Sequence, residues 1–167
     1  RGDDHLNNAF RQFYIYKFLN WDIPKYAHMP LIHGEDGSKL SKRHGAVDIM
    51  EFKKEGYLKE ALINNLILLG WSPGNNELIN IKEIIRLFEI KKLSKSSSIF
   101  SYDKLNFFNN HYLRDENGYK NFEYFCENDD YLKNLLNKDR NKMIKIFEAY
   151  KKELKNLKEL VKISETY

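Results

Sequence analysis

From residue 48 to the C-terminus, apolar residues recur at intervals of three or four positions, which is the period of an α-helix with one buried face. The clearest case lies between residues 57 and 69, where four leucines fall on one side of the expected helix: Leu58, Leu62, Leu66 and Leu69. Gly70 follows as a helix stop signal. The pattern predicts a mainly α fold for this part of the chain.

Helix start signals divide this region into separate helices. Asp48 precedes one helix, Asn80 with Glu83 a second, and Asp103 a third. These side chains can accept hydrogen bonds from the free N–H groups of a first helical turn. At least two more amphipathic helices are expected from Tyr119 onward, whereas the serine-rich stretch 91–98 is expected to be irregular.

The first 47 residues follow a different pattern. A helix is predicted over residues 6–18, with Asp4 as its cap, and an extended segment over 26–32 follows. Pro30 restricts that segment to the edge or end of a sheet. A helix followed by a strand is half of an α/β unit. Together with the missing initiator Met, this predicts that the remaining strands lie upstream in a longer protein.

Composition narrows the class of protein. Apolar residues are 42% and charged residues 31% of the 167 positions, as in a globular chain rather than a disordered one. No run reaches the roughly 18–20 apolar residues of a membrane helix, and no secretory signal is present. The single cysteine, Cys126, excludes an internal disulfide and fits the cytosol. The net charge of +4 is too small to demonstrate a polyanionic partner.

The segment S-K-L-S-K-R-H-G is the sharpest local motif. It places Lys39, Ser41, Lys42 and Arg43 in a glycine-flanked loop. Ammonium, guanidinium, hydroxyl and backbone N–H groups at this spacing suit a polyphosphate. They would also stabilise charge that develops when a phosphate group leaves. The alternative is an ordinary solvated basic loop, which strings of this kind usually are.

Two further segments carry candidate binding residues. Arg1 suits a bidentate contact with a carboxylate, and Asp4 suits a ribose hydroxyl or an ammonium group, although Asp4 equally suits a helix cap. Leu31 and Ile32 stand at the end of a predicted strand, where sheet folds bind nucleotides, so they could wall an adenine ring or belong to an ordinary core.

Several other site types are excluded. The sequence has no Walker A or Rossmann glycine motif, and its five histidines lack metal-ligand spacing. No protein-bound metal is predicted. Cys126 stands among aromatic residues and is expected to be buried rather than nucleophilic.

The ordered set of segments resembles bacterial glutamyl-tRNA synthetases, which are class I aminoacyl-tRNA synthetases. The segments read R-G-D-D-H-L-N-N, H-M-P-L-I, D-G-S-K-L-S-K-R-H-G-A and E-G-Y-L-K-E-A-L-I-N-N-L-I-L-L-G-W-S, and I-F-S-Y-D-K-L-N-F-F-N-N-H-Y-L-R continues the series. Each segment alone is weak evidence for the family, but the occurrence of all of them in this order is specific to it. The resemblance covers residues 1–115, and the remainder is similar in helical character only.

The resemblance implies roles for the loop. Lys39-Leu40-Ser41-Lys42-Arg43 would be the local version of the class signature K-M-S-K-S, which closes on ATP and stabilises the leaving pyrophosphate. Lys39, Ser41, Lys42 and Arg43 would then be catalytic, and Lys39, Leu40 and Lys42 would contact ATP.

The resemblance also implies roles for the N-terminal segments. Arg1 would hold the substrate glutamate. Asp4 and His5 would face the nucleotide and the acceptor end of tRNA. Leu31 and Ile32 would meet the adenine ring.

A domain plan follows from the same resemblance. Residues 1–47 would be the C-terminal part of a Rossmann-like catalytic domain, 48–115 a helical subdomain that contacts the tRNA stem, and 116–167 the start of a helical anticodon-binding domain. The class signature H-I-G-H is absent from the sequence, so this chain alone is expected to be inactive. The expected partners are ATP with Mg²⁺, L-glutamate and tRNA-Glu, in a monomeric cytoplasmic enzyme.

Two alternatives stay open at this point. The chain could be a non-catalytic tRNA-binding module, although pure RNA binding does not need a phosphate loop. It could also belong to a related glutamyl synthetase that acts on tRNA-Gln as well. The helical C-terminal half argues against the glutaminyl relatives, whose anticodon domains are β-barrels.

Overall fold

The structure is a computed structural model that describes residues 1–45 and 48–167. The predicted boundary between residues 47 and 48, and Ala46 of the loop motif, fall outside these ranges. The elements, in chain order, are a 3₁₀ helix (Asp3–His5), α1 (Leu6–Phe18), β1 (Ile32–His33), a 3₁₀ helix (Lys42–His44), α2 (Ile49–Lys54), α3 (Lys59–Leu68), α4 (Ile81–Leu87), a 3₁₀ helix (Ile90–Lys92), β2 (Ser98–Ile99), α5 (Tyr102–Leu113), α6 (Gly118–Glu127), α7 (Asp130–Lys138), α8 (Arg140–Tyr150) and α9 (Glu159–Glu165). The prediction of a mainly α fold is confirmed.

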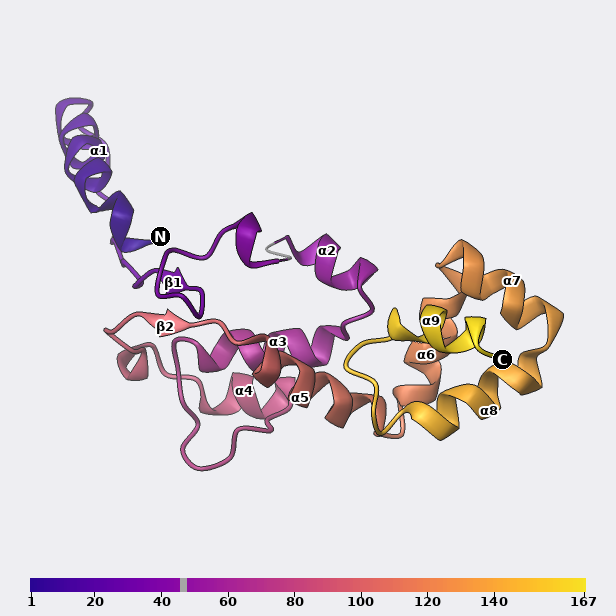
Figure 1. The fold of residues 1–167 in the computed structure, drawn as a ribbon. Helices are drawn as coiled ribbons and strands as arrows, with labels where there is room; N and C mark the ends of the chain where they lie inside the picture. The colour runs from indigo at the N-terminus through magenta and orange to yellow at the C-terminus, as the bar shows by residue number, and fades with distance from the viewer. Residues whose placement is uncertain (46–47) are drawn as a thin grey trace.

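These elements form an elongated molecule (Figure 1). The helix α1 stands at one end, the helices α2 to α5 occupy the middle, and α6 to α9 gather at the other end. In the described part of the chain, no helix is both long enough and apolar enough to cross a membrane.

Two of the four predicted side-chain caps, those of Asp48 and Asn80, are confirmed. The Asp48 carboxylate accepts a hydrogen bond from the backbone N–H of Met50 at 2.7 Å. Asn80 and Glu83 form a reciprocal capping box at the start of α4. The cap assigned to Asp103 is wrong: Ser101 is the N-cap of α5, without a side-chain cap bond, and Asp103 lies in the first turn.

The helix α1 differs from the prediction in two ways. Its N-cap residue is His5 rather than Asp4, because Asp4 lies within the preceding 3₁₀ helix. Its apolar side chains, expected to face a core, are largely exposed, with 85% of Phe18 accessible and only Ala9 buried. Figure 1 shows the reason, since α1 projects away from the other helices.

A two-stranded parallel sheet joins the N-terminal segment to the helical region. Ile32 of β1 pairs with Ser98 of β2, and His33 pairs with Ile99. The strand β2 lies at the end of the serine-rich stretch that was expected to be irregular, so that prediction missed it. A two-residue strand is too short to display an alternating pattern, and its pairing partner lies far away in the sequence.

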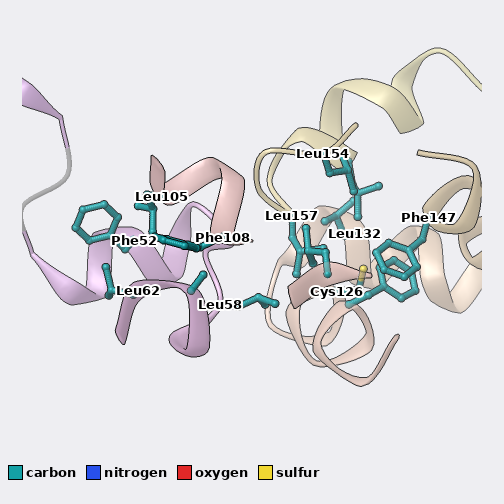
Figure 2. Close-up of a cluster of buried hydrophobic side chains, with 14 of the residues drawn as sticks. Phe52, Leu58, Leu62, Leu105, Phe108, Cys126, Leu132, Phe147, Leu154 and Leu157 are labelled. Atoms are coloured by element: carbon teal, nitrogen blue, oxygen red, sulfur yellow. The ribbon is translucent and has the colours of Figure 1, made fainter. Parts of the chain in front are cut away.

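One buried cluster links the middle of the molecule to its C-terminal end. The part of the cluster in the middle of the molecule includes Phe52, Leu105 and Phe108. The part at the C-terminal end includes Leu132 and Phe147. Figure 2 shows both groups, with Leu58 and Leu157 near the region where they approach each other. Burial of this apolar surface is the main stabilising contribution to the helical region.

Hydrogen bonds reinforce this connection. The fully buried Asn109 side chain of α5 accepts a bond from the Leu58 N–H at 2.8 Å and donates to the Lys155 carbonyl at 2.7 Å. The Leu157 N–H also donates to the Gly56 carbonyl. The predicted division at residue 115 stays a prediction, but the core and these hydrogen bonds extend across it.

Gly118 explains the break between α5 and α6. The helix α6 begins at this residue, one position before the expected start at Tyr119. A Cβ atom on Gly118 would lie 2.0 Å from the carbonyl oxygen of Leu113. Only glycine permits so close an approach of the two helices at this point.

Candidate functional site

A cavity of about 440 Å³ lies between the N-terminal segments and the helical region. Five predicted site residues line it, and they come from three separate segments: Arg1, Leu31, Ile32, Lys39 and Leu40. Part of its remaining wall consists of Leu66 and Leu69, near the end of α3, and of Ser94, Ser96 and Ser98. The cavity thus offers an apolar lining with a few cationic and hydroxyl groups, as small-molecule sites do.

The cavity does not gather every predicted residue. Asp4, His5, Ser41, Lys42 and Arg43 are absent from its lining. Asp4 is nevertheless joined to it, because the Lys39 ammonium donates a hydrogen bond to Asp4 Oδ2 at 2.8 Å. This bond lowers the pKa of Asp4 below its usual value.

Arg1 is held by contacts on its own side of the cavity. Its guanidinium donates to the side-chain oxygen of Gln12 and lies 5.7 Å from the ring centre of Tyr26. Its backbone carbonyl accepts a hydrogen bond from the Met29 N–H at 2.7 Å. The two segments that carry Arg1 and Leu31 are therefore fixed side by side.

His5 stands beside the Asp4–Lys39 pair. Its Nε2 lies 3.9 Å from Asp4 Oδ1, and its Nδ1 is 3.3 Å from the Asn8 amide nitrogen. The ring is exposed. His5 is thus available to a ligand that approaches Asp4 from the solvent.

The basic loop is organised by the carboxylate of Asp36. It accepts hydrogen bonds from the backbone N–H of Ser38 at 2.9 Å and from the Ser38 hydroxyl at 2.7 Å. The Arg43 guanidinium pairs with it at 3.3 Å, and His44 Nε2 lies 3.1 Å from it. The bonds from Ser38, followed by that from His44, lower the pKa of Asp36 well below its usual range.

Lys42 differs from the other two cations of the loop. Lys39 and Arg43 each pair with a carboxylate, whereas Lys42 is exposed and its ammonium group makes no hydrogen bond or ion pair with any residue that the structure describes. An unpaired ammonium group is free to bind an incoming anion without first breaking an ion pair.

The acidic residues near the loop do not provide a cage for Mg²⁺. Asp4 and Asp36 are both engaged by cations, and residues 1–45 and 48–167 contain no group of three His, Cys, Asp or Glu side chains that could hold a metal ion. The side chains present therefore fit a metal ion that is bound by the phosphate oxygens of a ligand better than a metal ion that is coordinated by the protein.

The sequence did not single out several residues that organise this region. Asp36 could have been found from its Asp-Gly-Ser turn, where an aspartate side chain commonly accepts bonds from the N–H two residues on. His44 offered no such signal, because its contacts depend on how the loop folds back. The interpretation of Cys126 is confirmed: it is fully buried, and burial raises its pKa to about 12.

Comparison with known proteins gives this arrangement its family context. Residues 1–107 match the family model described as "tRNA synthetases class I (E and Q), catalytic domain". The chain belongs to this family. The expected resemblance to class I synthetases is thereby confirmed.

Close relatives of this synthetase chain are glutamate–tRNA ligases. The glutamate–tRNA ligase 1 of Granulibacter bethesdensis is 52% identical over 115 residues, which are 69% of this chain and 24% of that protein. The glutamate–tRNA ligase of Francisella tularensis subsp. novicida is 48% identical over 115 residues, with 25% of that protein covered. The chain thus matches about a quarter of the length of these curated relatives.

Solved structures extend the likeness to nearly the whole chain. A glutamate–tRNA ligase from Elizabethkingia meningosepticum, crystallised with its amino acid, matches with a TM-score of 0.74 and 28% identity over 99% of this chain and 36% of that one. The glutamate–tRNA synthetase of Elizabethkingia anophelis gives a TM-score of 0.75 over 37% of its length. The C-terminal helices of this synthetase chain therefore also belong to the shared fold.

Proposed function

We propose that this chain is part of a glutamate–tRNA ligase, which activates L-glutamate with ATP and transfers the glutamyl group to tRNA-Glu. The observation that carries the proposal is the cavity on which Arg1, Leu31, Ile32, Lys39 and Leu40 converge. These residues supply a carboxylate-binding group, an apolar wall and a cation from three segments. A non-catalytic RNA-binding module has no need for such a cavity beside a cationic loop.

Each side chain at the cavity has a binding role that follows from its chemistry. The Arg1 guanidinium binds the substrate carboxylate, and Leu31 and Ile32 pack against the adenine ring. Asp4 and His5 face the ribose and the acceptor end of tRNA. Leu40 packs beside the nucleotide, at the start of the cationic loop.

The phosphate loop acts on the triphosphate. The ammonium groups of Lys39 and Lys42 pair with the negatively charged phosphate oxygens, and Arg43 adds a planar guanidinium. Ser41 contributes its hydroxyl as a hydrogen-bond donor. A glutamate carboxylate oxygen attacks the α-phosphorus of ATP, which gives glutamyl-adenylate and pyrophosphate. The loop stabilises the charge that develops on the departing pyrophosphate.

In the second step the terminal ribose hydroxyl of tRNA attacks the acyl carbon and releases AMP. Both steps depend mainly on positioning and charge stabilisation. Mg²⁺ accompanies ATP and is bound by its phosphate oxygens.

The helical segments extend the site toward tRNA. We assign residues 48–115 to contact with the inner side of the tRNA and residues 116–167 to the start of an anticodon-binding region. The high TM-scores of the synthetase structures support this assignment. We further propose that the enzyme works as a monomer in the cytoplasm, where the single reduced cysteine fits.

Glutamate-dependent exchange of pyrophosphate into ATP tests the proposal. The complete protein that carries this segment is expected to catalyse the exchange in the presence of tRNA-Glu, and the 167-residue chain alone is expected to show negligible exchange and charging. No exchange by the complete protein with glutamate would contradict the proposed reaction. Charging by the chain alone at the rate of the complete protein would contradict its assignment as a part of the enzyme.

Titration of the chain with labelled tRNA-Glu and an unrelated tRNA tests the helical segments. A preference for tRNA-Glu that survives moderate salt would support a recognition surface within residues 48–167. Equal and steeply salt-sensitive binding would mean that the lysine-rich helices make only non-specific phosphate contacts. Charging of tRNA-Gln by the complete protein would favour the broader glutamyl synthetase.

A further inference from the structure

We propose that His44, anchored by Asp36, is a positioning residue that holds the loop of residues 39–43 in the shape needed to bind phosphate. This inference rests on the proposed function, because it gives the loop's conformation a role in the same reaction. His44 and Asp36 need not touch the substrate. They act through the backbone at Ser41, next to Lys42, whose ammonium group has no ion-pair partner among the described residues.

The hydrogen bonds of His44 define which ring nitrogen carries the proton. The backbone N–H of Ser41 donates to His44 Nδ1 at 2.9 Å. An amide N–H can only donate, so Nδ1 accepts this bond, which is shorter than the 3.2 Å contact of Nδ1 with the Ser41 carbonyl oxygen. The Asp36 carboxylate beside Nε2 can only accept, so the two contacts together favour a neutral ring with its proton on Nε2. Nε2 in turn lies 3.1 Å from Asp36 Oδ1 and 3.1 Å from the Ser38 hydroxyl. The chain of bonds thus runs from Ser41 through the imidazole to Asp36.

Asp36 is itself fixed, which makes it an anchor rather than a mobile partner. Its Oδ1 atom accepts the two bonds from Ser38, and the Gly34 N–H donates to the Ser38 carbonyl at 2.8 Å within the same turn. Its second oxygen, Oδ2, pairs with Arg43. Asp36 and His44 therefore tie together the two ends of the loop, on either side of Lys39 to Lys42.

The ring of His44 is also fixed by packing. Its side chain is only 13% exposed, although the loop itself lies at the surface. A Cβ atom on Gly34 would lie 2.6 Å from His44 Cδ2, so the ring rests directly against the backbone of Gly34. A ring held on one side by backbone and on two edges by hydrogen bonds has one orientation available. Pre-organisation of this kind spares the loop a conformational cost when it meets the transition state.

The first test reads the imidazole directly in the 167-residue chain. Long-range proton–nitrogen NMR spectra of the neutral His44 ring are expected to show a protonated Nε2 and an unprotonated Nδ1. Asp36→Asn is expected to weaken the preference for this form, whereas Glu35→Gln, which removes the neighbouring exposed carboxylate, is expected to leave it unchanged. A ring protonated on Nδ1, or one that exchanges freely between the two forms, would overturn the proposal.

The second test measures pyrophosphate exchange by the complete protein. His44→Ala is expected to lower kcat about ten- to a hundredfold while the KM for glutamate stays within about twofold, as for a misplaced reacting group. His44→Asn is expected to recover part of the loss, because its amide oxygen can accept the Ser41 N–H bond. Gly34→Ala provides an independent variant that displaces the ring without altering it, and it is expected to lower kcat in the same way.

The outcomes separate this inference from the function on which it rests. An unchanged kcat in His44→Ala would overturn the positioning role. The same conclusion would follow if His44→Asn recovered no activity and all variants had a lower melting temperature. Absence of exchange in the unsubstituted protein would refute the proposed function and this catalytic role with it. In that case the NMR spectra would still decide whether the hydrogen-bond chain exists.

Discussion

The ammonium group of Lys39 lies 2.8 Å from Oδ2 of Asp4, although the two residues are 35 positions apart in the chain. This ion pair links the segment that carries Arg1 to the phosphate loop. Lys39 lines the candidate cavity itself, so the ion pair forms at its edge. An anionic ligand that reaches Lys39 must compete with the Asp4 carboxylate.

The pKa of Asp4 provides a direct test of this pairing. Lys39→Met is expected to raise the pKa of Asp4 toward its ordinary value of 3.8, because the hydrogen bond from Lys39 is the main cause of its lowering. Because the pKa of Asp4 is lower in the folded chain than in the unfolded chain, its ionised form stabilises the fold above pH 3.8. This stabilisation is lost as the pH falls from 3.8 through the lower pKa of Asp4 in the folded chain. Carboxyl-carbon NMR titration measures the change, and Lys42→Met serves as the control. An unchanged Asp4 pKa in Lys39→Met would contradict the ion pair.

Lys42 is expected to be the loop cation with the largest kinetic effect. In the complete protein, Lys42→Ala should lower the rate of adenylate formation about a hundredfold, the usual loss when one charge-stabilising group is removed. The affinity for glutamate should change little, since Lys42 does not line the cavity. Pyrophosphate exchange measures the rate, with the exposed Lys54→Ala as a charge-matched control. An unchanged exchange rate would remove Lys42 from the mechanism.

Gly118→Ala is expected to destabilise the junction between α5 and α6. The added methyl group would lie 2.0 Å from the carbonyl oxygen of Leu113, which belongs to the backbone and can move only if a helix moves. The free energy of unfolding should fall by about 3 kcal/mol. Urea denaturation of the two proteins measures the difference. Glu116→Ala, an exposed change in the same turn, should stay within about 0.5 kcal/mol, and a similar effect of both changes would contradict the steric explanation.

Cys126 is expected to be unreactive in the folded chain. Burial raises the pKa of its thiol to about 12, so the thiol stays protonated at neutral pH and is sealed from reagents. A disulfide reagent should modify it only after unfolding. The folded chain favours the protonated thiol more than the unfolded chain does, so this preference stabilises the fold fully below pH 9.0, the ordinary pKa of a thiol. The stabilisation should be lost as the pH rises from 9.0 toward about 12.

Comparison with Cys126→Ala isolates the alkaline effect. The stability advantage of the unsubstituted chain over this variant should shrink above pH 9, by up to about 1.4 kcal/mol per pH unit. Rapid modification of the native chain at neutral pH would show that the thiol is accessible, contrary to its burial.

Local signals in the sequence were sufficient for much of the helical framework. Asp48 and Asn80 cap the helices that follow them, because a cap requires only a short side chain and the N–H groups two or three residues later. Asp103 failed as a cap because α5 already begins at Tyr102, with Ser101 as its N-cap residue, so that Asp103 lies inside the first turn.

The candidate site was predictable in composition but not in geometry. The loop motif identified Lys39, Lys42 and Arg43 as phosphate-binding candidates. It gave no indication that Lys39 and Arg43 pair with carboxylates while Lys42 makes no ion pair with any described residue. Nor did it single out His44, whose partners lie three to eight residues away through a folded turn.

The sequence by itself determined the helical class, the starts of several helices and the residue types of the phosphate loop, since these depend on spacing and on contacts within one turn of the chain. Only the tertiary structure decided that Ile32 pairs with Ser98, that Asp4 meets Lys39, and that Asp36 holds His44. The physical reason is that these contacts arise when packing of the helical core and return of the loop bring distant segments together. Their energies depend on distances and burial that no local pattern encodes.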